Sequence, residues 1–261
     1  MILAAGRGER MRPLTDGCPK PLLAVRGKPL VQWSIEALAR GGFQDLVVNT
    51  AWLGQQIADH LGTQFSLHLP IAATRKALLE TRADHVRITY SHEGRDFGSA
   101  LETAGGIVRA LPMLDGIFWV LAGDIFAPDF VFSETAVQRF AASGKLAHLW
   151  LVPNPAHHPH GDFGLAPRDS STPGHAQLAL GHADVQYTYS TIGLFRPALF
   201  APPYCDIPAG NPHGIKTKLA PILRAAMDDA QVTAELYTGE WTDVGTPERL
   251  AQLNHQHPAP N

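Results

Sequence analysis

The sequence has 261 residues, enough for one large α/β domain or two small ones with a substantial core. A formal net charge of −3 and a hydrophobic content of 45% exclude a strongly basic nucleic-acid binder and a disordered chain. No stretch approaches the roughly 18 apolar residues of a membrane span, and no signal-peptide pattern opens the chain, so we expect a cytoplasmic protein. Cys18 and Cys205 lack the spacing of a disulfide framework or zinc site and are interpreted as packing residues.

Strands and helices alternate in the first half of the chain. The apolar run "MILAAG" predicts a strand ended by Gly6, and a helix is predicted over 30–40 before the glycines at 41 and 42. The next predicted elements are a strand in "DLVVNT", a helix in "LGQQIADHLG", a strand over 86–90, a helix in "TAGGIVRAL" and a strand over 117–124. This order predicts a mainly parallel sheet covered by helices on both faces.

The remaining segments complete one predicted domain over 1–254, followed by a flexible tail over 255–261. Residues 63–84 are interpreted as an excursion from the sheet, and 153–181 as loop or hairpin because of their many Pro, Gly, Ser and His residues. The later predicted elements are strands in "QYTYSTIGLF", a helix over 216–227, a strand over 235–237, a turn in "WTDVGT" and a helix over 247–253.

Glycines and cations are concentrated in "LAAGRGERMRPLTDGCPKPLL", residues 3–23. Gly6 and Gly8 follow the first predicted strand and leave backbone N–H groups at its carboxyl end, where ligands bind in open α/β sheets. Arg7, Arg10, Arg12 and Lys20 are the cations that can reach phosphate oxygens from this loop. The pattern is neither the dinucleotide motif nor the P-loop. Taken alone, it is also compatible with an ordinary glycine turn that carries solvated cations.

Two aspartates stand where a metal ion could be held. Asp124 ends the apolar strand of "IFWVLAGD", and Asp243 precedes a glycine turn and a helix in "EWTDVGTPERL". Carboxylates at the carboxyl end of a sheet suit a magnesium ion that bridges phosphates. Each aspartate, taken alone, also fits a turn or a helix cap.

The ordered motif "LAAGRGERMRPLT…PKPLL" resembles the signature of the sugar-1-phosphate nucleotidyltransferases, also called nucleotide-sugar pyrophosphorylases. The resemblance implies a Rossmann-like three-layer αβα sandwich, so that 1–254 is a single nucleotidyltransferase domain. It also implies that Arg10 and Lys20 bind NTP phosphates and that Asp124 and Asp243 coordinate Mg²⁺. Arg10, Lys20 and Asp124 are the implied catalytic residues. The implied nucleotide-binding residues are Leu3, Ala4, Ala5, Gly6, Gly8, Arg10, Lys20, Thr103 and Gly105.

Several further motifs resemble one branch of this family, the N-acetylmuramate-1-phosphate uridylyltransferases of bacterial peptidoglycan recycling. They are "ETAGG", "NTAWLGQQI", "HHPHGDFGL", "YSTIGLF", "KLAPILRAAM" and "WTDVGTPERL". The implied substrates are UTP and N-acetylmuramate α-1-phosphate. The residues implied for the sugar phosphate are Asn49, Glu102, Asp162, Thr191 and Lys218. Lys218 also fits a solvated lysine in the first turn of a helix, and the histidines at 157, 158 and 160 lack the spacing of a zinc site.

Two alternatives stay open at this point. One is a sugar-1-phosphate nucleotidyltransferase with another base or sugar, such as thymidylyl, guanylyl or uridylyl transfer to a glucose, mannose or heptose phosphate. The other is a non-catalytic relative that binds a nucleotide sugar and regulates a partner. The presence of both phosphate cations and both metal carboxylates favours an enzyme. We expect a monomer, with no nucleic-acid or membrane partner.

Overall fold

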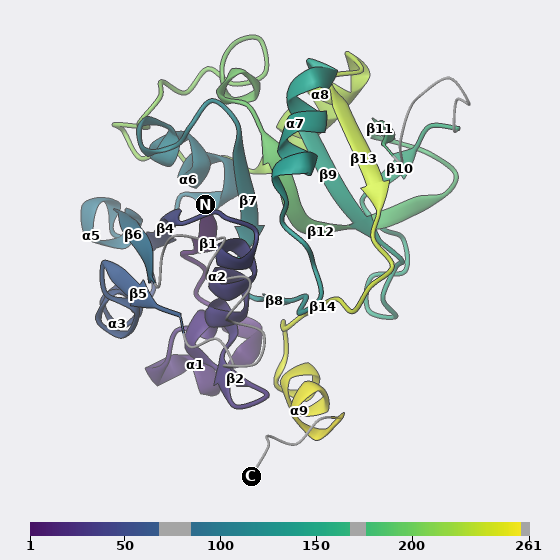
Figure 1. The fold of residues 1–261 in the computed structure, drawn as a ribbon. Coiled ribbons are helices and arrows are strands. Elements are labelled where there is room, and N and C mark those ends of the chain that lie inside the picture. Colours follow the sequence, from purple (N-terminus) through teal and green to yellow (C-terminus); the bar gives the residue numbers. More distant parts are fainter. Residues whose placement is uncertain (68–84, 168–175, 257–261) are drawn as a thin grey trace. The chain divides into compact units, whose positions relative to one another are not determined.

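The computed structural model describes residues 1–67, 85–167 and 176–256, so most of the predicted excursion over 63–84 lies outside the described residues. The chain forms two compact units (Figure 1). Unit 1 consists of Met1, 101–122 and 135–241, and unit 2 consists of 2–100, 123–134 and 242–261. Each unit is described by itself below.

Unit 2 contains the beginning and the end of the chain. Its strands are β1 (Ile2–Ala4), β2 (Ala24–Val25), β3 (Lys28–Pro29), β4 (Asp45–Thr50), β5 (Gln64–Ser66), β6 (His85–His92), β8 (Ile125–Phe126) and β14 (Thr242–Asp243). Its helices are α1 (Leu14–Gly17), α2 (Leu30–Arg40), α3 (Gly54–Leu61), α5 (Glu93–Phe97) and α9 (Pro247–Gln256), with short 3₁₀ turns at Glu9–Met11 and Lys20–Leu22. The sheet order is β1-β4-β6-β5, parallel except for the edge strand β5.

The predicted helices and strands of this unit are confirmed because their sequence signals are local. Helix α2 matches the predicted range 30–40, and β4 matches "DLVVNT". Helix α3 ends at Leu61 and is followed by Gly62, whose positive φ of 64° glycine adopts without strain. The predicted tail begins two residues too early, since α9 continues through Gln256.

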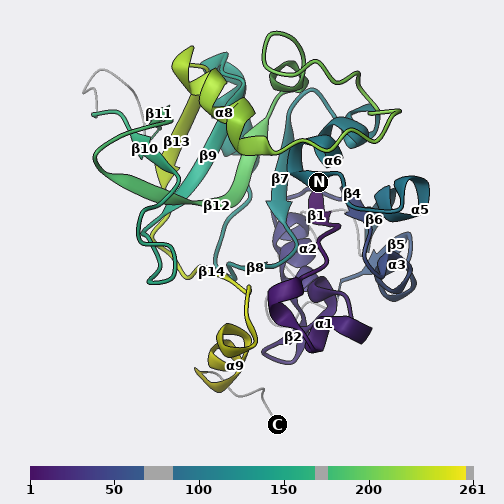
Figure 2. The ribbon, with the colours of Figure 1, turned by 180° about the vertical axis from the view of Figure 1, so that it is seen from behind.

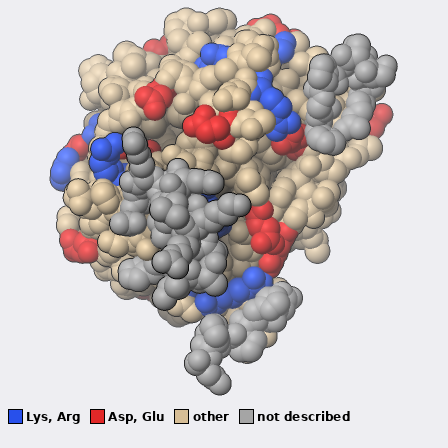
Figure 3. All heavy atoms as spheres, viewed as in Figure 1, with Lys and Arg blue, Asp and Glu red and all other residues tan. Residues whose placement is uncertain are grey.

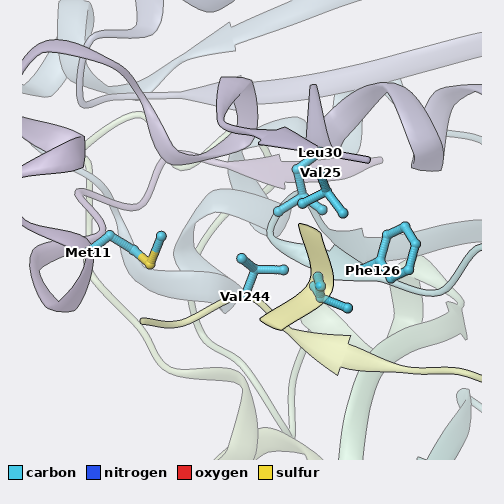
Figure 4. Close-up of a cluster of buried hydrophobic side chains, with 6 residues drawn as sticks. Met11, Val25, Leu30, Phe126 and Val244 are labelled. Carbon is cyan, nitrogen blue, oxygen red and sulfur yellow. The ribbon is translucent and has the colours of Figure 1, made fainter. Parts of the chain in front are cut away.

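A buried apolar cluster joins the ends of the chain in unit 2 (Figure 4). Phe126 of β8 and Val244 after β14 are fully buried beside Leu30 of α2. The other members are Met11, Val25 and Leu253. Burying side chains of this size contributes about 1.5–3 kcal/mol each, so the cluster stabilises β8 and β14 against the first residues of the chain.

Unit 1 holds the middle of the chain. Its strands are β7 (Phe118–Ala122), β9 (Ala147–Val152), β10 (Phe163–Leu165), β11 (Gln177–Leu180), β12 (Gln186–Phe195) and β13 (Val232–Leu236). Its helices are α6 (Glu102–Ala110), α7 (Glu134–Ser143) and α8 (Leu219–Asp228), with 3₁₀ turns at Leu111–Met113 and Pro197–Phe200. The strand order is β10-β11-β13-β9-β12-β7, and helices α7 and α8 lie on opposite sides of this sheet (Figures 1 and 2).

The α/β class is confirmed, but the expectation of a mainly parallel sheet is correct for unit 2 only. In unit 1 the pair β13–β9 is parallel, whereas β12 runs antiparallel to both β7 and β9. The reason is local, because the predicted hairpin region over 153–181 returns the chain to the sheet without a helical crossover. The predicted helix over 216–227 begins at Leu219, and α7 and β9 had no counterpart in the sequence prediction.

The surface shows no concentration of one sign of charge on the face drawn in Figure 3, where Lys and Arg are interspersed with Asp and Glu among uncharged residues. Among the residues that the structure describes, no helix is long and apolar enough to cross a membrane.

Candidate active site

The two predicted metal carboxylates lie on paired strands of unit 2. Strands β8 and β14 are antiparallel, with Ile125 opposite Asp243. The backbone N–H of Val244 donates to the carbonyl oxygen of Asp124 at 2.9 Å. The N–H of Gly123 in turn donates to the carbonyl of Leu3 at 2.7 Å, so Asp124 is held at the end of β1. The ladder thus brings Asp124 and Asp243 together beside the predicted phosphate loop.

Lys20 reaches Asp124 from that loop. Its Nζ forms an ion pair with Oδ2 of Asp124, and the lysine side chain is 9% exposed against 38% for the aspartate. Gly8 adopts φ 66°, and a Cβ there would lie 3.3 Å from Cβ of Lys20. The hydroxyl of Thr15 donates to the carbonyl of Gly8 at 2.8 Å. The glycine loop therefore closes around the lysine stem.

The other cations of the loop differ in their partners. Arg12 donates to Asp16 at 2.7 Å, and the guanidinium of Arg7 lies 3.6 Å from the centre of the Trp52 ring. Arg10 is exposed and makes no hydrogen bond or ion pair with any described residue. Of the three arginines, Arg10 is thus the one whose guanidinium is available to an incoming anion.

Arg249 holds Asp243 and was missed by sequence reasoning. Its Nη1 contacts Oδ1 of Asp243 and donates to the carbonyl of the same residue at 3.0 Å. Arg249 lies in the first turn of α9, where its backbone N–H points to the Thr246 hydroxyl at 3.4 Å. The motif "WTDVGTPERL" contained the signal, since a basic residue in the helix that follows the glycine turn can fold back onto the aspartate.

Asn49 is buried and its side chain is fully engaged. Its Oδ1 accepts the N–H of Ala4 at 2.8 Å, and its Nδ2 donates to buried Glu93 at 2.6 Å. Asn49 therefore supports the end of β1, and its predicted contact with a sugar phosphate stays a prediction. Ala4 and Ala5 are buried, whereas Gly6 is exposed and a Cβ there would meet nothing within 4 Å.

In unit 1, the start of α6 lies beside Lys218, the residue that precedes α8. The carbonyl of Thr217 accepts the N–H groups of Ala104 at 2.9 Å and Gly105 at 3.1 Å, which places Lys218 beside this helix start. Glu102 and Lys218 are exposed, and Glu102 adopts φ 62°. Such a positive φ in a residue other than glycine is uncommon and carries strain.

Gly105 is buried, and its backbone is occupied within unit 1. Its carbonyl accepts from Asn211 at 3.1 Å, and a Cβ would lie 2.5 Å from the carbonyl of Ile215. Close packing of the chain thus accounts for a glycine at this position. A contact of Thr103 or Gly105 with nucleotide is a prediction that the structure leaves untested.

Asp162 and Thr191 lie near each other at the β10–β12 end of unit 1. Asp162 accepts the N–H of Tyr189 at 2.9 Å, and His158 lies 3.2 Å from its other oxygen. Two residues further, Thr191 sits in a β-bulge with φ 63°. Trp241 donates to the carbonyl of Ser190 at 3.1 Å in the same region. Bulges of this kind turn side chains out of the sheet and are frequent at functional sites.

The residues present fit a magnesium ion. Asp124 and Asp243 supply hard oxygen ligands on adjacent strands, and their side chains are 38% and 26% exposed. Magnesium is usually held by one or two carboxylates together with water and substrate phosphates. Within the described ranges, no three His, Cys, Asp or Glu side chains form a group that could hold a metal ion.

Solved structures of sugar nucleotidyltransferases have the same fold. The chain matches a putative glucose-1-phosphate thymidylyltransferase from Bacillus anthracis with a TM-score of 0.70 and 18% identity, over 100% of this chain and 95% of the other. It matches a UDP-glucose pyrophosphorylase from Acinetobacter baumannii with a TM-score of 0.70 and 15% identity, over 98% of this chain and 93% of the other.

Residues 1–259 match the Nucleotidyl transferase family, and the chain belongs to that family. It is 44% identical to the N-acetylmuramate alpha-1-phosphate uridylyltransferase of Neisseria meningitidis serogroup B, over 97% of this chain and 95% of the relative. It is 28% identical to a mannose-1-phosphate guanyltransferase of Candida albicans, over 99% of this chain and 66% of the relative.

Proposed function

We propose that this protein transfers a uridylyl group from UTP to N-acetylmuramate α-1-phosphate, giving UDP-N-acetylmuramic acid and pyrophosphate. The observation that carries this proposal is the 44% identity to a uridylyltransferase of that specificity over 97% of the chain. The reaction supplies a cell-wall precursor in the cytoplasm by recycling an existing sugar. The sequence identity to the mannose-1-phosphate guanyltransferase is lower, at 28%, and that relative represents the same type of reaction with another pair of substrates.

The residues of unit 2 suit the phosphate chemistry. A phosphate oxygen of the sugar attacks the α-phosphorus of UTP, and the bond from that phosphorus to the bridging oxygen of pyrophosphate breaks. The exposed guanidinium of Arg10 and the ammonium group of Lys20 supply positive charge for the departing pyrophosphate. Arg10, Lys20 and Asp124 are the proposed catalytic residues, and no covalent intermediate on the protein is needed.

Asp124 and Asp243 would hold Mg²⁺, which when bound neutralises phosphate charge during the transfer. Arg249 orients the second of these carboxylates through its two contacts with Asp243. The glycine loop, from Leu3 to Gly8, would accept the triphosphate at its backbone, since Gly6 is exposed and a Cβ there would meet nothing within 4 Å.

Unit 1 carries the residues proposed for the base and the sugar. Thr103 at the start of α6 would contact the uracil, together with the chain around Gly105. Glu102 and Lys218 are exposed at the same helix start, so that Lys218 can pair with a phosphate or with the lactyl carboxylate of the sugar. Asp162 and Thr191 would contact the sugar from the bulged end of β12. Asn49 would act indirectly, through its hydrogen bond to Ala4.

The test is pyrophosphate release in the presence of Mg²⁺, with five NTPs crossed against the 1-phosphates of N-acetylmuramate, N-acetylglucosamine, glucose and mannose. Release confined to UTP with the muramate sugar supports the proposal. Release with another pair of substrates would keep the family's chemistry and change the substrate assignment. No pyrophosphate release with any pair would favour a regulatory protein that binds a nucleotide sugar. Light scattering of the purified chain tests the proposed monomer.

A further inference from the structure

A cavity of about 690 Å³ lies within unit 1, between helix α7 and the strands β9, β11 and β13. Figure 1 shows α7 lying over β9, and the cavity opens beside this helix. Most of the wall is apolar, contributed by Ala136, Phe140, Ala142, Pro167 and Leu178. This volume falls within the range of about 300–1,000 Å³ that small-molecule sites occupy.

One buried polar ring faces this apolar wall. His148 lines the cavity with 7% of its surface exposed, and its Nδ1 hydrogen-bonds to Thr233 at 2.9 Å. Its ring packs edge to face on Trp150, with centroids 4.5 Å apart at 85°. No described residue forms a hydrogen bond with Nε2 of His148. The second ring nitrogen is therefore left for an occupant of the cavity.

The imidazole offers that occupant a hydrogen-bond acceptor. Burial, together with the charge of Arg139, lowers the pKa of His148 to about 3, so the ring is neutral at physiological pH. The hydroxyl of Thr233 lies 3.5 Å from the carbonyl of Ala147. We assign the ring proton to Nδ1, which lets this hydroxyl accept from the ring and donate to the carbonyl. Nε2 then carries a lone pair that is available to a donor in the cavity.

The cavity is separate from the sugar residues of the same unit. His148 lies near the start of β9, opposite Leu194 of β12. The proposed sugar residues lie near the other end of β9, because Tyr189, which donates to Asp162, is opposite Leu151. The other polar residues that line the cavity are Arg139, Ser143, Lys145, Gln177 and Glu235, and Glu235 accepts from the Trp150 indole at 2.6 Å. The two sites use different ends of one strand.

We propose that this cavity is a binding site for a flat aromatic molecule that carries one N–H or O–H donor. The ring of the ligand packs against Phe140 and the other apolar residues of the wall, and its donor points to Nε2 of His148. The residues named for this cavity all belong to unit 1, and none of them is used in the uridylyl transfer proposed above, so the two proposals are independent.

Indole is the probe, because it is flat and has a single N–H donor. Calorimetric titration of the full chain should give a dissociation constant below about 1 mM. Indene has a similar shape without the donor and should bind about tenfold more weakly, the equivalent of one neutral hydrogen bond. Saturating UTP should leave the affinity for indole unchanged. Absence of indole binding, equal binding of indene, or displacement of indole by UTP would each overturn the proposal.

Two matched variants locate the site. Ala142 lines the cavity from the exposed side of α7, and its neighbour Ala141 does not. Ala142→Trp should fill the cavity and weaken indole at least about tenfold, whereas Ala141→Trp should bind as the wild type does. Equal affinity in both variants would contradict the assignment. If Ala142→Trp does not fold, NMR of the wild-type protein tests the same contact. The ¹⁵N resonance of Nε2 in His148, assigned by its loss in His148→Phe, should shift when indole is added. A constant resonance would refute the hydrogen bond.

Discussion

Lys20 and Asp124 form an ion pair although 104 positions separate them in the sequence. The lysine belongs to the glycine loop and the aspartate to the segment that enters β8, both in unit 2. In the absence of ligands, the charges of the two side chains thus compensate each other. A divalent cation held by the carboxylate would displace the ammonium group of Lys20 and leave it available to a phosphate. The pair therefore links the proposed metal site to the proposed phosphate site.

Lys20→Met should lower kcat/KM for UTP by about 10²–10³, since the methylene stem is kept and the charge that stabilises the leaving group is lost. Steady-state pyrophosphate release at varied UTP measures this. Arg12→Ala is the matched control, because Arg12 is on the same loop and pairs with Asp16 at an exposed position. Unchanged kinetics for Lys20→Met would remove Lys20 from the phosphate site.

Asp124→Asn should abolish turnover and leave the fold intact. The amide keeps the size of the side chain but lacks the charge that a magnesium ion requires. Turnover and thermal unfolding are measured together, with Asp129→Asn as an exposed control on the same segment. Near-wild-type activity would show that Asp124 is not a metal ligand.

Arg249→Met should raise the Mg²⁺ concentration needed for half-maximal rate by about tenfold while changing kcat little at saturating Mg²⁺. The reason is that Arg249 contacts Asp243 and would act by orienting this carboxylate. Asp243→Asn should stay inactive at every Mg²⁺ concentration, and Glu248→Gln on the same helix should behave as wild type. A loss of kcat that high Mg²⁺ does not restore would assign Arg249 a direct role.

Gly8→Ala and Gly6→Ala should differ in stability. At Gly8 the backbone is left-handed, and a Cβ would lie 3.2 Å from Thr15 and 3.3 Å from Lys20, so we expect a loss of about 1–2 kcal/mol in the free energy of unfolding. At Gly6 a Cβ meets nothing within 4 Å, so stability should stay within about 0.5 kcal/mol. Urea denaturation distinguishes the two, and equal stabilities would contradict the loop conformation.

The stability of the protein should fall below about pH 6.5 because of His148. Burial lowers its pKa to about 3 in the folded protein, from the ordinary value of 6.5, so the unfolded chain takes up the proton first as the pH falls. The loss at pH 5 amounts to about 2 kcal/mol, from 1.5 pH units at about 1.4 kcal/mol each. Denaturation of wild type and His148→Phe at pH 7 and pH 5 measures it, and an identical pH dependence of the two proteins would refute the buried neutral ring.

Sequence patterns predicted the elements whose signals are local. The range 30–40 became α2 because its apolar positions repeat with a helical period and two glycines follow it. Strand β9 was missed, although "AHLWLV" is buried along its whole length, because a short apolar run does not distinguish strand from buried helix. The antiparallel course of β12 was missed for a different reason, since strand direction depends on the partners that a strand finds in the sheet.

The sequence by itself determined the family's phosphate loop and the two carboxylate motifs, because each of these motifs consists of functional residues at fixed spacing within a short segment. Only the tertiary structure decided which of these groups meet. The β8–β14 ladder joins Asp124 to Asp243, Arg249 folds back onto Asp243, and Asn49 turns inward to support Ala4. These contacts depend on long-range backbone pairing and side-chain packing, whose stabilising free energy arises between segments that no local pattern connects.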